Sequence, residues 1–125
     1  MIRHFTFAAF LSLAPVLAFA DNCDTGQLTG FDGVYCFSKV FMGEDKRLND
    51  NYAELRSHLN ADQRNILKTA QLNWIEKRDT SCMPEPHTVN VDCALSITQE
   101  RADFLKARTT ECISVGCASR KLSEY

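Results

Sequence analysis

Six cysteines in a chain that begins with an export signal constrain the fold more than any other feature. Residues 1–20 start with a positive charge, continue as an apolar run and end in Ala18-Phe19-Ala20, the small-residue pattern that signal peptidase cleaves. The run is shorter than a membrane span requires, so a membrane anchor is the weaker interpretation. We therefore expect a signal peptide over residues 1–20 and one mature domain over residues 21–125, which is periplasmic or secreted.

The composition of the mature domain excludes some classes of partner. The full chain has a formal net charge of −2, and loss of Arg3 with the leader changes it to −3. A nucleic-acid-binding domain needs a basic face, so we expect no nucleic-acid partner. No second long apolar segment follows the leader, and we expect no stable membrane insertion after signal cleavage.

The cysteines favour disulfides over metal binding. All six follow the expected cleavage site, and an even count in an exported chain is typical of a disulfide framework. No CxxC pair is present and only two histidines follow the leader, so we expect no metal site and no cofactor. Six cysteines allow 15 different pairings, and the count alone does not choose among them.

Hydrophobic periodicity predicts an all-α domain. Apolar residues recur at helical spacing over residues 32–59, 61–81 and 92–112, which predicts three helices with a long first one. The short links between these segments make neighbouring helices antiparallel. The predicted fold is a small, disulfide-stapled, up-down-up three-helix domain.

Local signals mark the ends of these helices. Asn60 and Gln63 have the spacing of a capping box before the second helix, and Asp92 is a candidate cap for the third. Two prolines within residues 82–93 prevent the second helix from continuing. Gly116 is expected to end the regular structure and to leave a polar, frayed tail.

The predicted topology narrows the disulfide pairing. Cys82 and Cys93 both lie at the link between the second and third helices, and each remaining cysteine also has a partner nearby in the sequence. Pairing between neighbours closes the shortest loops and therefore costs least. We expect the disulfides Cys23–Cys36, Cys82–Cys93 and Cys112–Cys117.

Polar side chains interrupt the apolar stripes of all three predicted helices at a similar height. Because a buried charge needs a partner, we predict a network that joins Asp45, with Glu44 beside it, to Arg78 and Arg101. Trp74, the only tryptophan, lies one turn from Arg78 and is expected to fill the seam between the helices. The network either fixes the helix register alone or lines a groove in which a partner docks.

The sequence contains no convincing catalytic set. No histidine is spaced to activate Ser81 or Ser96, and His87 lies in the proline-containing loop. Glu44 and Asp45 are adjacent on a helix, so their side chains diverge by about 100° and form no acid pair. We expect that the protein is not an enzyme.

The residues of the helical stripes also carry a family resemblance. The segment from Asp45 to Leu55 has the spacing D-x-x-L-N-x-x-Y-x-x-L, and cysteines and polar residues follow it in a fixed order up to Leu105. The matching positions are Asp45, Leu48, Asn49, Tyr52, Gln71, Trp74, Arg78, Asp79, Cys82, Cys93, Thr98, Arg101 and Leu105. This pattern resembles the N-terminal domain of the LprI-like lysozyme inhibitors.

The resemblance implies an exported helical protein that inhibits lysozyme. Such a protein would bind a lysozyme or another peptidoglycan hydrolase and occlude it. The chain ends before the β-barrel domain that some relatives carry, so we expect binding through the helical domain. Candidate contact residues are the exposed Tyr35, Glu44, Met83, Glu85 and His87. Two alternatives remain, an envelope adaptor or structural module and an immunity protein against a cell-wall-degrading toxin.

Overall fold

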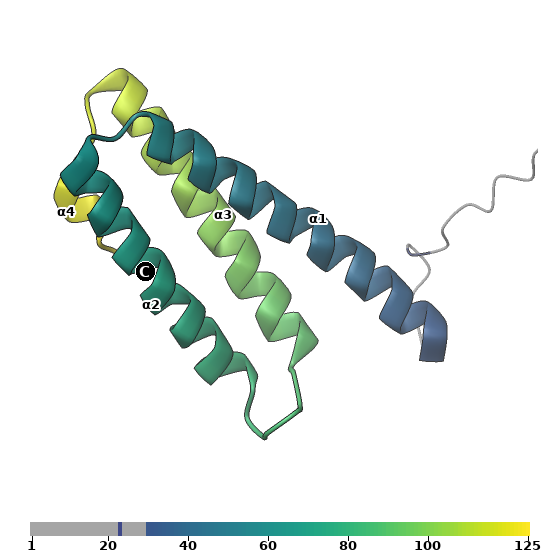
Figure 1. The fold of residues 1–125 in the computed structure, drawn as a ribbon. Helices are drawn as coiled ribbons and strands as arrows, with labels where there is room; N and C mark the ends of the chain where they lie inside the picture. Colours follow the sequence, from purple (N-terminus) through teal and green to yellow (C-terminus); the bar gives the residue numbers. More distant parts are fainter. Residues whose placement is uncertain (1–22, 24–29) are drawn as a thin grey trace, which may run out of the picture.

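The structure describes Cys23 and residues 30–125, and helices are the only regular elements among these residues, apart from an isolated β-bridge in one loop (Figure 1). This computed structural model contains α1 (Gly30–Ser57), α2 (Ala61–Cys82), α3 (Val91–Ser114) and α4 (Ser119–Leu122). The prediction of an all-α, disulfide-stapled fold is confirmed, and the three predicted helices end within two residues of the observed ones. The predicted signal peptide lies outside the described residues.

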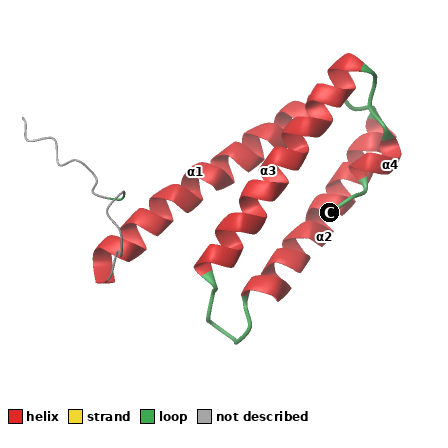
Figure 2. Ribbon diagram, turned by 180° about the vertical axis from the view of Figure 1, so that it is seen from behind, coloured by secondary structure: helices red, strands yellow, loops and turns green. Residues whose placement is uncertain are grey.

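The other two long helices, α1 and α2, both pack against α3. Helix α1 runs along α3, and α2 packs against both α3 and the short α4. The first part of α1 extends beyond the other helices, as Figures 1 and 2 show from opposite sides. Val34 lies on this overhang and is 67% exposed, so the apolar spacing of residues 32–59 does not place every apolar residue of α1 in the core.

The core lies where α1, α2 and α3 converge. Leu55, Leu67 and Leu105 are completely buried, and Trp74 is 5% exposed. These four residues belong to one cluster of buried side chains, together with Leu48, Leu59, Ala102 and Leu122. Trp74 therefore fills the seam between the helices, as its position on the stripe of α2 predicts.

Side-chain caps set the helix boundaries. The Asn60 side chain accepts from the Gln63 amide, and the Gln63 side chain accepts from the Asn60 amide, so the predicted capping box is present. The prediction that Asp92 caps α3 is wrong. Asn90 occupies the cap and accepts from the amide of Cys93, while Asp92 lies in the first turn, where its charge favours the helix dipole.

The chain after α3 is ordered against the core, which contradicts the predicted frayed tail. Gly116 adopts a positive φ of 102°, and its amide donates to the carbonyl of Glu111, so the chain turns back at this point. Leu122 on α4 is then only 1% exposed. The Lys121 ammonium pairs with the Glu111 carboxylate, which attaches α4 to the end of α3.

Three disulfides join cysteines that are close in the sequence. They link Cys23 to Cys36, Cys82 to Cys93 and Cys112 to Cys117. The first attaches the chain before α1 to that helix, the second closes the loop between α2 and α3, and the third closes the turn after α3. Within residues 30–125, no helix is long and apolar enough to cross a membrane.

Candidate functional site

An open groove lies between the overhanging part of α1 and the far end of α2. Its volume is about 470 Å³, and its walls come from all three long helices and from the loop between α2 and α3. The residues that line it are Phe37, Phe41, Asp45, Arg78, Asp79, Cys82, Met83, Val89 and Ala94. The groove combines an apolar floor with a charged edge, a composition that suits a protein-binding site.

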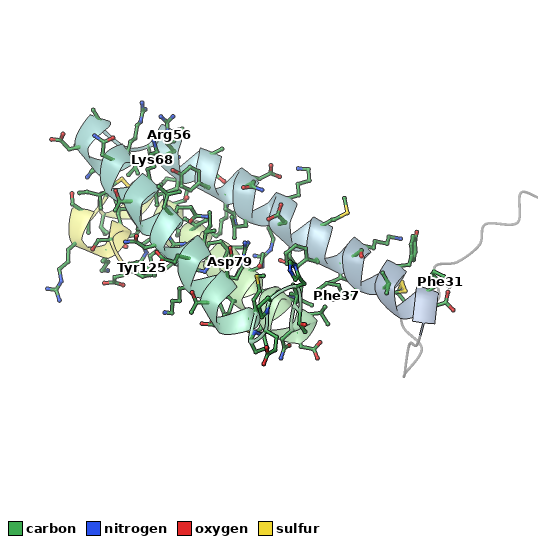
Figure 3. All side chains as sticks on the ribbon, turned by 60° about the horizontal axis from the view of Figure 1, so that its bottom comes forward. Phe31, Phe37, Arg56, Lys68, Asp79 and Tyr125 are labelled. Carbon is green, nitrogen blue, oxygen red and sulfur yellow. A yellow bond between two sulfur atoms is a disulfide. The ribbon has the colours of Figure 1, made fainter. Side chains whose placement is uncertain are left out.

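Two stacked aromatic rings form the α1 side of the groove. Phe37 and Phe41 are one helical turn apart, and their ring centres lie 5.8 Å from each other. Both are half-buried, and they precede the α1 residues Arg47 and Asn51 that bond to α3. Figure 3 shows Phe37 close to the loop that follows α2, whereas Phe31 lies at the outer end of α1.

The loop between α2 and α3 is held in one shape by several local contacts. The Thr88 amide donates to the carbonyl of Glu85 at 3.1 Å and closes a turn, with Pro86 and His87 at its centre. His87 has a φ of 67°, the positive value that a type II turn requires after proline. At the base, the Asn90 amide donates to the carbonyl of Cys82 at 2.7 Å beside the Cys82–Cys93 disulfide.

The charged edge of the groove is built differently from the predicted network. Arg78 Nη2 lies 2.7 Å from the carboxylate of its neighbour Asp79, while Asp45 accepts from the Asn49 side chain at 3.2 Å. Arg78 and Asp45 line the same groove. Among the described residues, no hydrogen bond or ion pair joins Asp45, Arg78 and Arg101, so the predicted ionic network is wrong.

Arg101 is buried, and its hydrogen-bond partners are neutral. Its Nε donates to Gln71 Oε1 at 3.0 Å, and its Nη1 donates to the main-chain oxygen of Glu124 at 2.8 Å. The guanidinium also lies 4.7 Å from the centre of the Phe104 ring. Burial lowers the pKa of Arg101 to about 10, so the group remains charged at neutral pH.

Glu44 takes part in a bridge between α1 and α3. Arg47 Nε donates to Glu44 at 2.7 Å, and Arg47 Nη1 donates to Asp103 on α3 at 2.6 Å. Hydrogen bonds to Asp103 and then to Glu44 raise the pKa of Arg47. The side-chain amide of Asn51 also donates a hydrogen bond to the carbonyl of Ala102 on α3, at 2.9 Å. These contacts fix the register of the two helices, and no pattern in the sequence singled out Arg47 or Asn51.

The predicted contact residues do not all lie together. Met83 lines the groove, and Glu85 and His87 are exposed in the loop beside it. Glu44 is half-buried in the bridge to α3, and Tyr35 is 56% exposed but lies roughly 120° around α1 from Phe41. Phe41 and Val89 also line the groove, although the sequence analysis selected neither as a contact residue.

Most of the remaining residues of the family pattern lie in or beside the core, whereas Asn49 is exposed. Leu48, Trp74, Thr98, Arg101 and Leu105 are buried. Tyr52 packs against the core cluster, and the Thr98 hydroxyl donates to the carbonyl of Ala94 at 2.7 Å. In the part of the chain that the structure describes, no three His, Cys, Asp or Glu side chains are grouped to hold a metal ion.

Comparison with known proteins gives one match. The family model described as "Lysozyme inhibitor LprI" matches residues 21–105. This range includes α1, α2 and the loop with its disulfide, together with the first part of α3. No curated protein and no solved structure matches the chain.

Proposed function

We propose, since the chain belongs to the LprI family of lysozyme inhibitors, that it is an exported protein that binds a lysozyme and occludes its substrate cleft. The family match over residues 21–105 is the observation that carries this proposal. Binding alone is sufficient for inhibition, so the protein needs no catalytic group, and we assign it no enzymatic activity. Its signal peptide over residues 1–20 would deliver it to the periplasm or to the outside of the cell.

The groove and its neighbouring loop are the best candidate for the surface that contacts lysozyme. The Cys82–Cys93 disulfide and the turn at Pro86 hold the loop before any partner arrives. A preordered loop loses little conformational entropy on binding, which favours affinity. The half-buried rings of Phe37 and Phe41 offer apolar anchors next to this loop, as the centre of a protein interface requires.

Backbone strain at the tip of the loop supports the same surface. His87 is not glycine, yet it has a φ of 67°, a conformation that costs of order 1 kcal/mol or more for such a residue. Strained residues of this kind concentrate at binding sites. We therefore assign contact roles to Met83, Glu85 and His87, with Tyr35 and Glu44 at most at the edge of the contact area.

Charge favours encounter with a basic enzyme. The protein has a net charge of −3 after removal of the leader, and the groove edge carries the carboxylates of Asp45 and Asp79. Opposite charges on two proteins raise the association rate more than the final affinity. Association with a basic lysozyme should consequently slow as salt is added.

A competition experiment tests occlusion of the cleft. The oxidised protein is titrated into a host-type lysozyme by calorimetry, with and without a chitooligosaccharide that fills the substrate cleft. Occlusion predicts that the saccharide weakens association in proportion to its own occupancy. Equal affinity with a free and a filled cleft would show that the protein binds elsewhere and would refute the mechanism.

Paired substitutions test the assigned surface. His87→Gly keeps a residue that tolerates a positive φ while it removes the imidazole, and Met83→Ser removes an apolar contact at the groove. Each should weaken association at least about fivefold, equivalent to ~1 kcal/mol. Ile113→Ser is the matched control, because Ile113 is 66% exposed near the opposite end of α3. Normal affinity of both groove variants would move the binding site away from this surface.

A further inference from the structure

A second cavity lies on a different part of the molecule. It occupies about 410 Å³ between α2, α3 and the segment that follows α4. Trp74, Ile97 and Phe104 supply apolar walls, and Lys77 and Arg101 supply two cationic groups. It shares no lining residue with the groove. The proposed inhibition of lysozyme leaves this cavity without a role.

Arg101 is the unusual group in this cavity. The residue is 3% exposed, and its Nη2 is buried without a hydrogen-bond partner among the described residues. The guanidinium donates two hydrogen bonds through its other nitrogens, from Nε to the neutral Gln71 amide oxygen and from Nη1 to the main-chain oxygen of Glu124. A buried guanidinium normally pairs with a carboxylate, because an uncompensated charge in the interior is costly.

Lys77, the second cation of the cavity, contacts the same segment after α4. Its ammonium lies 3.2 Å from the main-chain oxygen of Tyr125 and 5.9 Å from the centre of the Tyr125 ring. Both cations of the cavity are thus held by main-chain oxygens of the same short segment, residues 124–125. At Arg101, a carboxylate oxygen would be a stronger acceptor than the neutral main-chain oxygen of Glu124, because both partners would then carry charge.

We propose that this cavity binds a small organic monocarboxylate that carries a flat apolar group. The carboxylate replaces the Glu124 main-chain oxygen at Arg101 and reaches toward Lys77, which requires residues 124–125 to move aside. The apolar group lies against Trp74 and Phe104. Glu100 and Glu124 also border the cavity, so their carboxylates disfavour a multiply charged anion such as phosphate.

The volume and the walls agree with a ligand of this size. Pockets for small molecules occupy roughly 300–1,000 Å³ and combine apolar walls with a few polar groups that orient the ligand. Trp74 is the only tryptophan of the chain, so its fluorescence reports directly on the occupation of the cavity.

Phenylacetate and its neutral analogue phenylacetamide are the probes. We expect phenylacetate to change Trp74 fluorescence with saturation, and phenylacetamide, which has the same shape without the charge, to bind at least about tenfold more weakly. Lys77→Gln should weaken phenylacetate binding about fivefold. Lys68→Gln should leave it unchanged, because Lys68 is an exposed lysine of α2 that does not line the cavity (Figure 3).

The proposal would be overturned by equal affinity for the two probes, by an unaltered affinity of Lys77→Gln, or by the absence of saturation up to about 10 mM phenylacetate. Arg101→Gln is a further test if a thermal melt shows that it remains folded, and it should abolish binding. The decisive comparison of the two probes uses the wild-type protein. All of these readouts are independent of lysozyme.

Discussion

The guanidinium of Arg78 lies 5.4 Å from the centre of the Trp74 ring, so the most deeply placed aromatic side chain of the core supports a residue of the groove edge. Trp74 is buried among the leucines of the three long helices, whereas Arg78 is half-exposed and pairs with Asp79. The cation–π contact orients the Arg78 side chain along the groove. The packing of Trp74 in the core therefore also positions a side chain of the groove.

Replacement of Trp74 by alanine should destabilise the fold strongly. The substitution removes a large buried ring and leaves a cavity, which costs about 3–5 kcal/mol in the free energy of unfolding. Urea denaturation followed by circular dichroism measures the change. Leu72→Ala is the control on the same helix, because Leu72 is 57% exposed, and it should change stability by less than about 0.5 kcal/mol. A Trp74→Ala loss below 1 kcal/mol would contradict the packing.

Removal of the Cys82–Cys93 disulfide should affect both stability and binding. The bond closes a loop with a sequence separation of 11, and its loss through the double change Cys82→Ser and Cys93→Ser should cost about 2–4 kcal/mol. The freed loop should also bind lysozyme more weakly, because its ordering then occurs during binding. Calorimetry on both proteins, at a temperature where each is folded, separates the two effects. Unchanged stability would argue against a structural role for this bond.

Leu122 tests whether the segment after α3 belongs to the folded unit. Leu122 is completely enclosed by the core cluster, although it lies beyond residue 105, where the family match ends. Leu122→Ala should destabilise the protein by about 2–4 kcal/mol. Val115→Ala, at a position that is 81% exposed, provides the comparison and should be almost neutral. Equal stability of the two variants would mean that α4 is not attached in solution.

The ion pair between Lys121 and Glu111 should be visible in a pH titration. The hydrogen bond from Lys121, with a smaller contribution from the charge of Arg108, lowers the pKa of Glu111 below 4.5. Because the folded-state pKa is the lower one, the pair stabilises the fold above about pH 4.5, and this contribution disappears as the pH falls through the folded pKa. Carbon NMR of the Glu111 carboxyl should show a low midpoint that rises in Lys121→Met. The same midpoint in both proteins would exclude the pair.

The sequence predicts the helices well because several local signals agree. The apolar spacing, the capping box at Asn60 and the prolines after Cys82 all mark the same boundaries that the structure shows. Asp92 was assigned the wrong role because Asn90 and Asp92 are both good caps, and only the backbone geometry at Asn90 decides between them.

The polar contacts were less predictable, because they depend on the relative rotation of the helices. Helical spacing places Asp45, Arg78 and Arg101 at similar heights, but it does not fix which way each side chain turns. Arg78 pairs with the carboxylate of the next residue, Asp79. Arg101 donates to the main-chain oxygen of Glu124, in a segment after α4 for which the sequence predicts no regular structure. The groove depends on the divergence of α1 from α2, a tertiary property that no single segment encodes.

Inhibition of lysozyme is the central claim, and a turbidity assay measures it most directly. A host-type lysozyme is mixed with increasing amounts of the oxidised protein, and the clearing of a bacterial cell-wall suspension is followed. We predict that the lysis rate falls as the protein is added and approaches zero once the enzyme is saturated, with Met83→Ser less effective than Ile113→Ser. A full lysis rate at a large molar excess of the wild-type protein would contradict it.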